Sequence, residues 1–297
     1  MGLMMSIDDR PARLCYQLPQ PWKKGGDQYS NHMDRITGYF EGPFTATCPP
    51  GVVLAGQKFV KVHETGPGAY TPLDLDRVGD SDGVSLMGSY LQSYKYFEQI
   101  LPSVKQIFTF NEDIQAAADT HLKNLVAGAS PDAEPERVVG IHIRRGDQVS
   151  TDSVRRPIFR FPPDAFFAEA MSHFERAYRE NGVVFVVTSD DLDWAHASKV
   201  FHRPNVRFSL FSKSVSDMDH NAALDLALLT SCDDIIMSLG TFGAWAGLLS
   251  GGSVIYYRDQ LDMTNPAVQG HYNVEDLFPS DWISIGDDDL IAEKAVQ

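Results

Sequence analysis

The sequence has 297 residues, of which 43% are hydrophobic and 22% charged, and it carries a formal net charge of −15 with a pI of about 4.9. Its length gives room for two domains, and its acidic balance argues against a surface for nucleic acid or anionic membranes, which requires a basic face. Three cysteines without metal-ligand spacing, Cys15, Cys48 and Cys232, argue against a zinc site and a dense disulfide framework.

The chain also lacks the sequence patterns of membrane insertion and export. It contains no uninterrupted run of about eighteen apolar residues, the length needed to cross a bilayer. The first residues, MGLMMSIDDRPAR, have neither the basic start nor the apolar core of a signal peptide. We therefore expect a soluble chain with no signal, no membrane segment and no nucleic-acid partner.

The N-terminal part of the chain predicts little regular structure. Residues 1–85 contain many prolines and glycines, with only short candidate strands such as Lys58–Val62. The aromatic-rich segment Ser89–Leu101 predicts the beginning of a helix. Asn111–Val126 predicts a second helix, because it starts with Asn and Glu and is rich in alanine. The polar, Pro-containing stretch 127–136 is typical of a linker.

After Arg137 the pattern changes to a regular alternation of strands and helices. Such an alternation predicts βαβ units and a parallel, doubly wound sheet. The expected strands are 138–143, Val183–Thr188, 206–210, Ile235–Ser238 and Ser253–Tyr257, and the expected helices lie at about 163–180, 192–200, 220–231 and 242–249. We therefore divide the chain into a partial first lobe at 1–130, loop-rich at 1–85, a second lobe at 137–286 and a tail at 287–297.

The first strand of this alternation ends in a cluster of charges. Residues 138–147 read VVGIHIRRGD, so an apolar run ends in His142, Arg144, Arg145 and Asp147. In open α/β sheets ligands bind at the carboxyl ends of the strands, and the planar guanidinium of arginine pairs well with phosphate oxygens. The arginine pair therefore indicates a site for a doubly anionic group, with a strand end carrying solvated charges as the alternative.

The next strand also ends in polar residues. Thr188, Ser189, Asp190 and Asp191 follow the apolar run VVFVV. An acidic residue at such a point commonly accepts hydrogen bonds from ribose hydroxyls. The alternative is that Ser189 or Asp190 caps the following helix.

Asp225 is the only charged residue in the apolar segment AALDLALLTSC at 222–232. Burying an unpaired carboxylate is costly, so we expect this carboxylate to have a dedicated donor partner. The adjacent N1–H and N2–H donors of a guanine ring would suit its two oxygens. A cap-like or partly exposed aspartate is the alternative, and Cys232 in the same segment is expected to be a buried thiol.

The segment IIMSLGTFGAWAGLLSGG at 235–252 predicts a strand that passes into a helix through Ser238, Gly240 and Thr241. A helix that starts with small and hydroxyl residues leaves backbone N–H groups free, and its dipole favours an anion there. Phe242 begins the apolar face of this helix, which we expect to pack in the core.

Several segments together resemble α-1,2-fucosyltransferases of glycosyltransferase family 11. They are HIRRGD at 142–147, VVTSDD at 186–191 and DLALLTSCDDIIMSLGTFGAWAGLLSGG at 225–252, supported by SYLQSYKYF at 89–97 and LFPSDWISI at 277–285. The His-x-Arg-Arg-x-Asp pattern is shared with α-1,6- and protein O-fucosyltransferases, whereas TFGAWAGLLSGG is more specific to the α-1,2 group. The resemblance covers roughly residues 86–286.

The resemblance implies an α/β, GT-B-like fold with two Rossmann-like lobes, of which the first is incomplete or irregular here. It implies a galactoside 2-α-L-fucosyltransferase, which moves L-fucose from GDP-fucose to the 2-OH of a terminal β-galactoside with inversion, without metal or cofactor. By this resemblance Arg144 and Arg145 contact the pyrophosphate or the fucosyl end, Asp225 reads guanine, and Ser238 and Thr241 bind phosphate. The expected donor site is His142, Arg144, Arg145, Ser189, Asp190, Asp191, Asp225, Ser238, Gly240, Thr241 and Phe242.

In such a reaction the arginines stabilise the negative charge that grows on the leaving GDP. A carboxylate can take the proton from the acceptor hydroxyl, and Asp147 and Asp152 are the nearest candidates in the sequence. The expected catalytic residues are therefore Arg144, Arg145, Asp147 and Asp152.

The first lobe departs from the family pattern. Family members open it with a Gly-rich G-x-L-G-N-Q-like loop, preceded in animals by a membrane anchor, and the resemblance therefore implies a Golgi membrane protein. Neither feature occurs in this sequence. We expect the acceptor-side lobe to be truncated or strongly diverged, and the chain to be poorly active until a fuller lobe is restored.

Three alternative functions remain open at this point. One is an inactive GDP-sugar-binding remnant, and another is a protein O-fucosyltransferase with the same donor site. The third is a metal-dependent transferase with an Asp-x-Asp pair, for which Asp191–Asp193 and Asp74–Asp76 fit the spacing.

Overall fold

The computed structural model describes residues 39–41, 59–63, 65–66, 68–72, 83–87, 92–129, 134–146, 158–178, 182–211 and 218–294. The chain divides into two compact units. The first comprises Met1–Thr109 and Gly270–Pro279, and the second comprises Phe110–Gln269 and Ser280–Gln297. The segment 270–279 is thus a return of the chain into the first unit.

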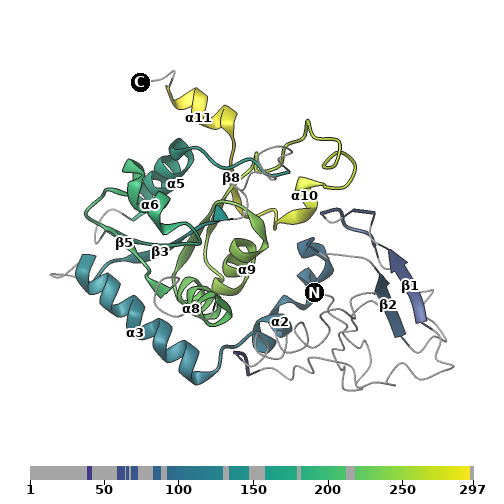
Figure 1. The fold of residues 1–297 in the computed structure, drawn as a ribbon, viewed down its shortest axis with the longest axis horizontal. Helices are drawn as coiled ribbons and strands as arrows, with labels where there is room; N and C mark the ends of the chain where they lie inside the picture. The colour runs from purple at the N-terminus through teal and green to yellow at the C-terminus, as the bar shows by residue number, and fades with distance from the viewer. Residues whose placement is uncertain are drawn as a thin grey trace. The chain divides into compact units, whose positions relative to one another are not determined.

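The second unit is built on a parallel sheet, whose described strands follow the order β5-β4-β3-β6-β7-β8 (Figure 1). All neighbouring pairs are parallel. The strands are β3 (Arg137–Ile143), β4 (Val183–Ser189), β5 (Val206–Phe208), β6 (Asp234–Met237), β7 (Val254–Tyr257) and β8 (Ile283–Ile285). The predicted α/β class and the Rossmann-like character of this unit are confirmed.

Helices cover both faces of this sheet (Figure 1). They are α3 (Glu112–Ala129), α5 (Asp164–Ala177), α6 (Leu192–Ala197), the 3₁₀ turn η6 (Lys199–Phe201), α8 (Met218–Thr230), α9 (Gly240–Ser250) and α11 (Asp287–Lys294). Because side chains alternate along a strand, Ile141 of β3 joins the core that contains Phe166 and Phe167 of α5. Gly140 faces the other side, where a Cβ atom would lie 2.8 Å from Leu229 of α8.

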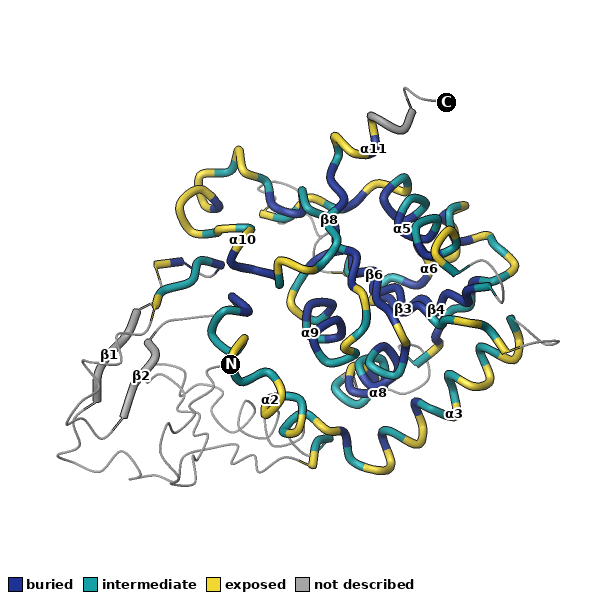
Figure 2. The backbone as a smooth tube through the Cα atoms, turned by 180° about the vertical axis from the view of Figure 1, so that it is seen from behind, coloured by how far each residue is buried: buried dark blue, intermediate teal, exposed yellow. Residues whose placement is uncertain are grey.

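The central strands and much of α9 are buried (Figure 2), and most of the buried residues in this unit are apolar. Val184–Val187 are at most 2% exposed, which explains why this stretch reads as a continuous apolar run rather than an alternating one. Cys232 is 4% exposed, which confirms the expected buried thiol. No helix in the described ranges is long and apolar enough to span a bilayer.

The strands and helices predicted between 137 and 257 are all present, with small shifts at their ends. The boundary between the units differs from the expected one at 130–137, since it falls after Thr109. The reason is that α3 packs on α8 and β5. Gln115 of α3 donates to the Ser231 hydroxyl at 2.9 Å, and the Arg207 guanidinium donates to the Gly128 carbonyl.

The first unit, in its described residues, contains a parallel pair of strands and several short helices. They are β1 (Phe59–His63), β2 (Gly83–Met87), the 3₁₀ turns η3 (Tyr94–Tyr96) and η4 (Glu98–Ile100), α2 (Leu101–Ile107) and α10 (Val274–Leu277). β1 coincides with the candidate strand at 58–62. The helix predicted from Ser89 starts only at Leu101, and Pro102 lies in its first turn, where proline is favoured.

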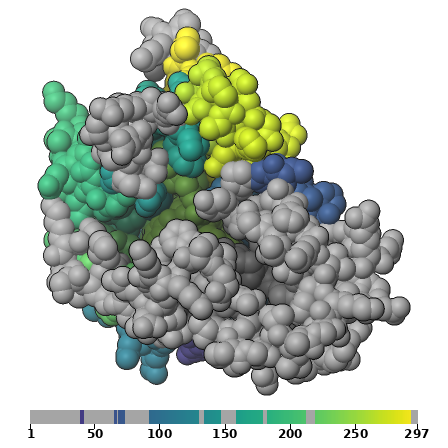
Figure 3. All heavy atoms as spheres, turned by 45° about the vertical axis from the view of Figure 1, so that its right-hand side comes forward, coloured from purple at the N-terminus to yellow at the C-terminus, as the bar shows by residue number. Residues whose placement is uncertain are grey.

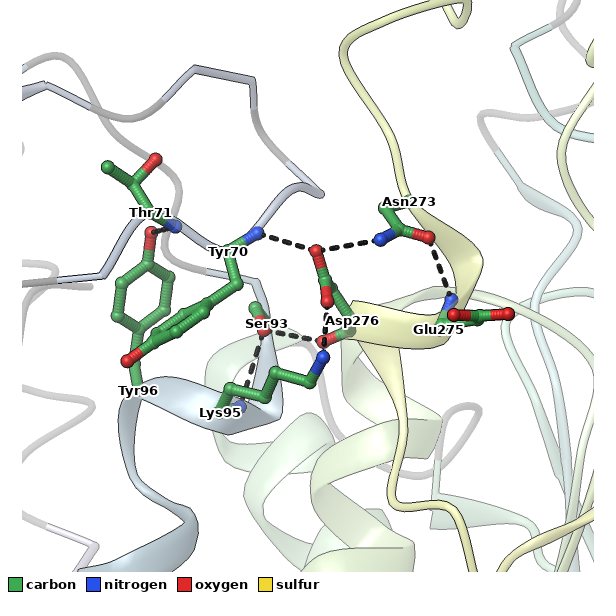
Figure 4. A network of polar contacts seen from close by, with 8 residues as sticks. All are labelled: Tyr70, Thr71, Ser93, Lys95, Tyr96, Asn273, Glu275 and Asp276. Atoms are coloured by element: carbon green, nitrogen blue, oxygen red, sulfur yellow. Dashed lines mark hydrogen bonds and ion pairs between the residues drawn. The ribbon is translucent and has the colours of Figure 1, made fainter.

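A polar network holds the returning segment in the first unit (Figure 4). The buried carboxylate of Asp276 pairs with Lys95 Nζ at 2.5 Å, and it accepts hydrogen bonds at 3.0 Å from the Tyr70 backbone N–H and from Asn273. The Ser93 hydroxyl donates to the Asp276 carbonyl at 2.5 Å. Burial raises the pKa of Asp276, but the hydrogen bonds from Lys95 and Tyr70 outweigh it and leave that pKa below its usual value.

Candidate functional site

The order of the strands defines where a ligand would bind. From β3 the chain proceeds through β4 to β5 on one side, and on the other side of β3 lie β6, β7 and β8. In open α/β sheets ligands bind at such a switch point, outside the carboxyl ends of the strands. The connections after β3 and β6 flank this point, and they carry Arg144 and the start of α9, respectively.

Arg144 follows β3 directly and is 38% exposed at its side chain. Its backbone N–H donates to the Ser238 hydroxyl at 2.9 Å, which ties the ends of β3 and β6 together. Its Nη1 lies 3.5 Å from Asp190 Oδ2. The guanidinium is therefore close to a carboxylate and still accessible to solvent.

Arg145 has different surroundings from its neighbour. Its side chain is only 18% exposed, and its Nε donates to Asp191 Oδ2 at 3.2 Å. Its guanidinium carbon lies 4.3 Å from the ring centroid of Trp194 and 4.6 Å from that of Phe161. The predicted contact between Arg145 and the donor pyrophosphate remains untested, but its guanidinium already has an anionic partner and two aromatic rings.

Asp190 and Asp191 follow β4 and contact the arginine pair. Asp190 Oδ1 accepts the Arg145 backbone N–H at 2.7 Å. Asp191 caps α6 by accepting the Trp194 backbone N–H at 3.1 Å, and its own N–H donates to the Ser189 hydroxyl at 2.9 Å. The cap of α6 is therefore Asp191, so the sequence prediction of Ser189 or Asp190 as the cap was wrong by one or two residues. The predicted contact with ribose remains untested.

Three predicted residues lie at or just before the start of α9, and two of them, Ser238 and Gly240, adjoin Arg144. Ser238 is fully buried, and its hydroxyl accepts the Arg144 N–H, so the hydroxyl braces the strand ends. Gly240 has a φ of +84°, which glycine adopts without strain, and its missing side chain leaves room beside the Arg144 stem. Thr241 is exposed in the first turn, where backbone N–H groups have no partner within the helix.

His142 lies within the sheet beneath these residues. It is 6% exposed, and its ring stacks on Phe242 at a centroid distance of 5.0 Å. Burial and the nearby Arg144 charge lower its pKa to about 3, so the imidazole is neutral. None of the described residues forms a hydrogen bond to its Nδ1 or to Thr188 Oγ1, which is adjacent in register.

Asp225 lies in α8, next to the carboxyl end of β5. Ser209, which follows β5, donates its hydroxyl to Asp225 Oδ1 at 3.1 Å. The residue as a whole is half-buried, but its carboxyl group is surrounded by protein. Burial raises the pKa of this carboxyl to about 7, against the effect of the Ser209 hydrogen bond. Ser209 is the dedicated donor partner that the sequence required but did not identify.

Two further site residues were not predicted from the sequence, and several that were predicted lie outside the described residues. Phe161 and Trp194 enclose Arg145. Their sequence positions, before a helix and inside one, predict only core packing and gave no signal for this contact. The candidate bases Asp147 and Asp152, and the pair Asp74–Asp76, lie outside the described ranges.

Comparison with known proteins identifies the family to which the chain is similar. The family model described as glycosyl transferase family 11 matches residues 81–286. The galactoside 2-alpha-L-fucosyltransferase Sec1 of Mus musculus is 29% identical over 203 residues, which cover 67% of this chain and 51% of that protein. The galactoside alpha-(1,2)-fucosyltransferase 1 of Aotus azarae is 30% identical over 198 residues, covering 66% and 51%. The chain thus spans about half the length of these curated relatives.

Solved fucosyltransferase structures are similar to the chain at low identity. A mutant of Arabidopsis thaliana FUT1 in complex with GDP matches with a TM-score of 0.45 and 11% identity, covering 83% of this chain and 71% of that one. NodZ alpha-1,6-fucosyltransferase soaked with GDP-fucose matches with a TM-score of 0.38 and 16% identity, covering 63% and 56%.

Proposed function

Since this chain belongs to glycosyl transferase family 11, we propose that it is an inverting galactoside 2-α-L-fucosyltransferase that uses GDP-fucose and needs no metal. The names of the curated relatives support the acceptor class, a galactoside, and the α-1,2 linkage. The donor and the inverting mechanism come from the resemblance of the sequence segments to the family.

One observation carries the proposal: at the switch point of the sheet, Arg144 lies beside the start of α9. The Ser238 hydroxyl joins the two connections by accepting the Arg144 N–H at 2.9 Å. A partly exposed guanidinium and a helix N-terminus are both suited to a pyrophosphate, and both offset the charge that grows on GDP as the glycosidic bond breaks. This arrangement supplies positive potential without a metal ion.

The remaining donor contacts are proposed from the buried polar groups around that point. We assign the guanine N1–H and N2–H groups to the Asp225 carboxyl, because burial destabilises its ionised form and two donors from the ligand would stabilise it. His142 is neutral and lies two residues before Arg144, so it can offer an acceptor or a donor without adding charge. Asp147 and Asp152 stay the proposed bases for the acceptor hydroxyl.

Two measurements on the same preparation test the proposal. Calorimetry of GDP binding, with ADP as the control nucleotide and with or without EDTA, tests the donor site. We expect binding selective for GDP that survives EDTA, and loss of binding on chelation would overturn the metal-free mechanism. Incubation with GDP-fucose and a simple β-galactoside, followed by NMR of the product, tests transfer and the α-1,2 linkage.

The outcomes separate the competing functions. GDP-selective binding without transfer to any acceptor would indicate a GDP-sugar-binding protein instead of an enzyme. Transfer to a folded protein but not to a galactoside would indicate a protein O-fucosyltransferase. Absence of GDP binding would overturn the proposal altogether.

A further inference from the structure

The Arg145 side chain is enclosed by two segments of the second unit. Trp194 and Asp191 come from the start of α6, and Phe161 comes from the segment before α5. That segment is itself fixed, because Arg160 N–H donates to the Gln260 carbonyl at 2.8 Å and Phe159 pairs with Leu261 in a β-bridge. Leu261 lies in the segment after β7, and that segment forms part of the outer surface (yellow-green in Figure 3).

Asp191 and its neighbour Asp190 together hold both the side chain and the main chain of Arg145. The Arg145 backbone N–H donates to Asp190 Oδ1, while its side-chain Nε donates to Asp191 Oδ2. Asp191 is in turn fixed as the N-cap of α6, through the N–H of Trp194. The peptide between Arg144 and Arg145 is therefore held from the β4–α6 connection, and with it the direction in which Arg144 leaves the sheet.

We propose that Asp191 and Trp194 are positioning residues of the donor site, which hold Arg145 as a clamp so that Arg144 is presented to the donor. This inference rests on the proposed function. It assigns different tasks to the two arginines: Arg144 contacts the pyrophosphate, and Arg145 fixes the connection that carries Arg144. It also assigns Asp191 to Arg145 instead of to ribose.

The contacts favour this division over a shared phosphate role. To reach the donor, the Arg145 guanidinium would have to leave two aromatic faces and a carboxylate that already satisfies its Nε. The Arg144 side chain is more exposed, at 38% against 18% for Arg145. A cation between two rings and a carboxylate is held in one orientation, which suits a positioning task.

A double-mutant cycle on GDP affinity tests the clamp. Trp194→Leu removes the ring, and Arg145→Met keeps the length of the side chain without its charge. If Trp194 acts through Arg145, each change weakens GDP about fivefold, and the double variant is no more than about twofold weaker than the worse single variant. Independent, multiplying effects would overturn the clamp, because Arg145 would then contribute to binding without Trp194.

Rescue and packing controls separate positioning from general stability. Trp194→Phe keeps an aromatic face for the guanidinium, and GDP affinity should stay within about twofold of wild type. Phe201→Leu thins the same aromatic cluster, since the Phe201 ring lies 6.4 Å from that of Trp194, but Phe201 is not one of the rings over Arg145. It should lower Tm and leave GDP affinity unchanged; an equal loss of GDP affinity would overturn the inference.

A readout that needs no nucleotide distinguishes failure of the clamp from failure of the proposed function. The Nε–H proton of Arg145 should exchange slowly with water in the wild type, as seen by NMR, and rapidly in Trp194→Leu and Asp191→Asn. If wild-type protein shows slow exchange but binds no GDP, the clamp exists and the proposed function is wrong. Rapid exchange in the wild type would overturn the clamp whatever the protein binds.

Discussion

Asp225→Asn should stabilise the protein at alkaline pH while it removes the preference for guanine. The carboxyl group of Asp225 is buried in α8, and its described hydrogen-bond donor is the neutral hydroxyl of Ser209. Burial raises the pKa of Asp225 to about 7, so the folded protein holds a proton there that the unfolded chain releases near the ordinary value of 3.8. Asparagine keeps an oxygen for Ser209 and carries no charge.

The direction in which stability changes with pH follows from the number of protons bound in the folded and unfolded states. Between about pH 4 and 7 the folded state binds more protons at Asp225 than the unfolded state, so the free energy of unfolding falls as the pH rises across this window. A difference of about three pKa units corresponds to at most about 4 kcal/mol, fully lost above pH 7. The asparagine variant lacks this loss, so its advantage over wild type should be small at pH 4.5 and largest at pH 8.

Urea unfolding of both proteins at pH 4.5 and pH 8 measures this difference. Removing any negative charge from a chain of net charge −15 relieves some repulsion, so Asp281→Asn, at an exposed turn position before β8, is the matched control. We expect a gain that grows with pH for Asp225→Asn and a small, nearly constant gain for the control. Equal pH dependence of the two variants would refute the argument that a charge is buried at Asp225.

The same residue makes a prediction about the ligand. Guanine donors favour the ionised carboxyl, so GDP binding should release a proton, and wild-type affinity should fall up to about tenfold for each pH unit below 7. The asparagine variant should show no such dependence and should bind GDP and ADP alike. Equal losses of GDP and ADP affinity in this variant would make Asp225 a structural residue.

Three further changes give distinct expectations. Arg144→Ala should lower transfer by orders of magnitude with little change in Tm, and Arg144→Lys should rescue poorly because a point charge cannot replace the planar fork; near wild-type turnover in the alanine variant would exclude this role. Gly240→Ala should cost about 1–2 kcal/mol in urea unfolding, because its φ of +84° strains any side chain, and it should weaken GDP by shifting the start of α9; unchanged GDP affinity would argue against that helix start as the phosphate site. Lys95→Met should destabilise the protein more at pH 7 than at pH 3: because the pKa of Asp276 is lowered in the folded state, its ionised carboxyl stabilises the fold above pH 3.8, and this contribution declines as the carboxyl protonates at lower pH. A loss of stability that is the same at both pH values would show that the ion pair is not its source.

Much of the second unit could be predicted because its strands are buried on both faces. Runs such as Val183–Ser189 then stand out as continuous apolar segments between amphipathic helices. β8 was missed because it has only three residues and begins after Asp281 and Trp282. α11 was missed because its three leading aspartates read as a tail, although acidic residues are favoured in a first turn.

The partners of the site residues could not be predicted in the same way. The arginine pair was evident from the sequence, but the different surroundings of Arg144 and Arg145 depend on Phe161 and Trp194, which tertiary packing brings to Arg145. Likewise, Ser209 lies 16 residues before Asp225, just after β5 and outside α8, and neither local pattern identifies the other residue as its partner. The sequence motifs identify the candidate functional groups, whereas tertiary packing determines which residues contact and position them.

The return of residues 270–279 to the first unit sets an order of assembly during synthesis. The carboxylate of Asp276 meets partners 206 and 181 residues earlier in the chain, at Tyr70 and Lys95. A growing polypeptide cannot make these contacts until nearly all of the second unit has left the ribosome. The unit whose larger part is translated first is therefore completed last, and its polar groups at Ser93 and Lys95 stay without the Asp276 partner until residues 270–279 are translated.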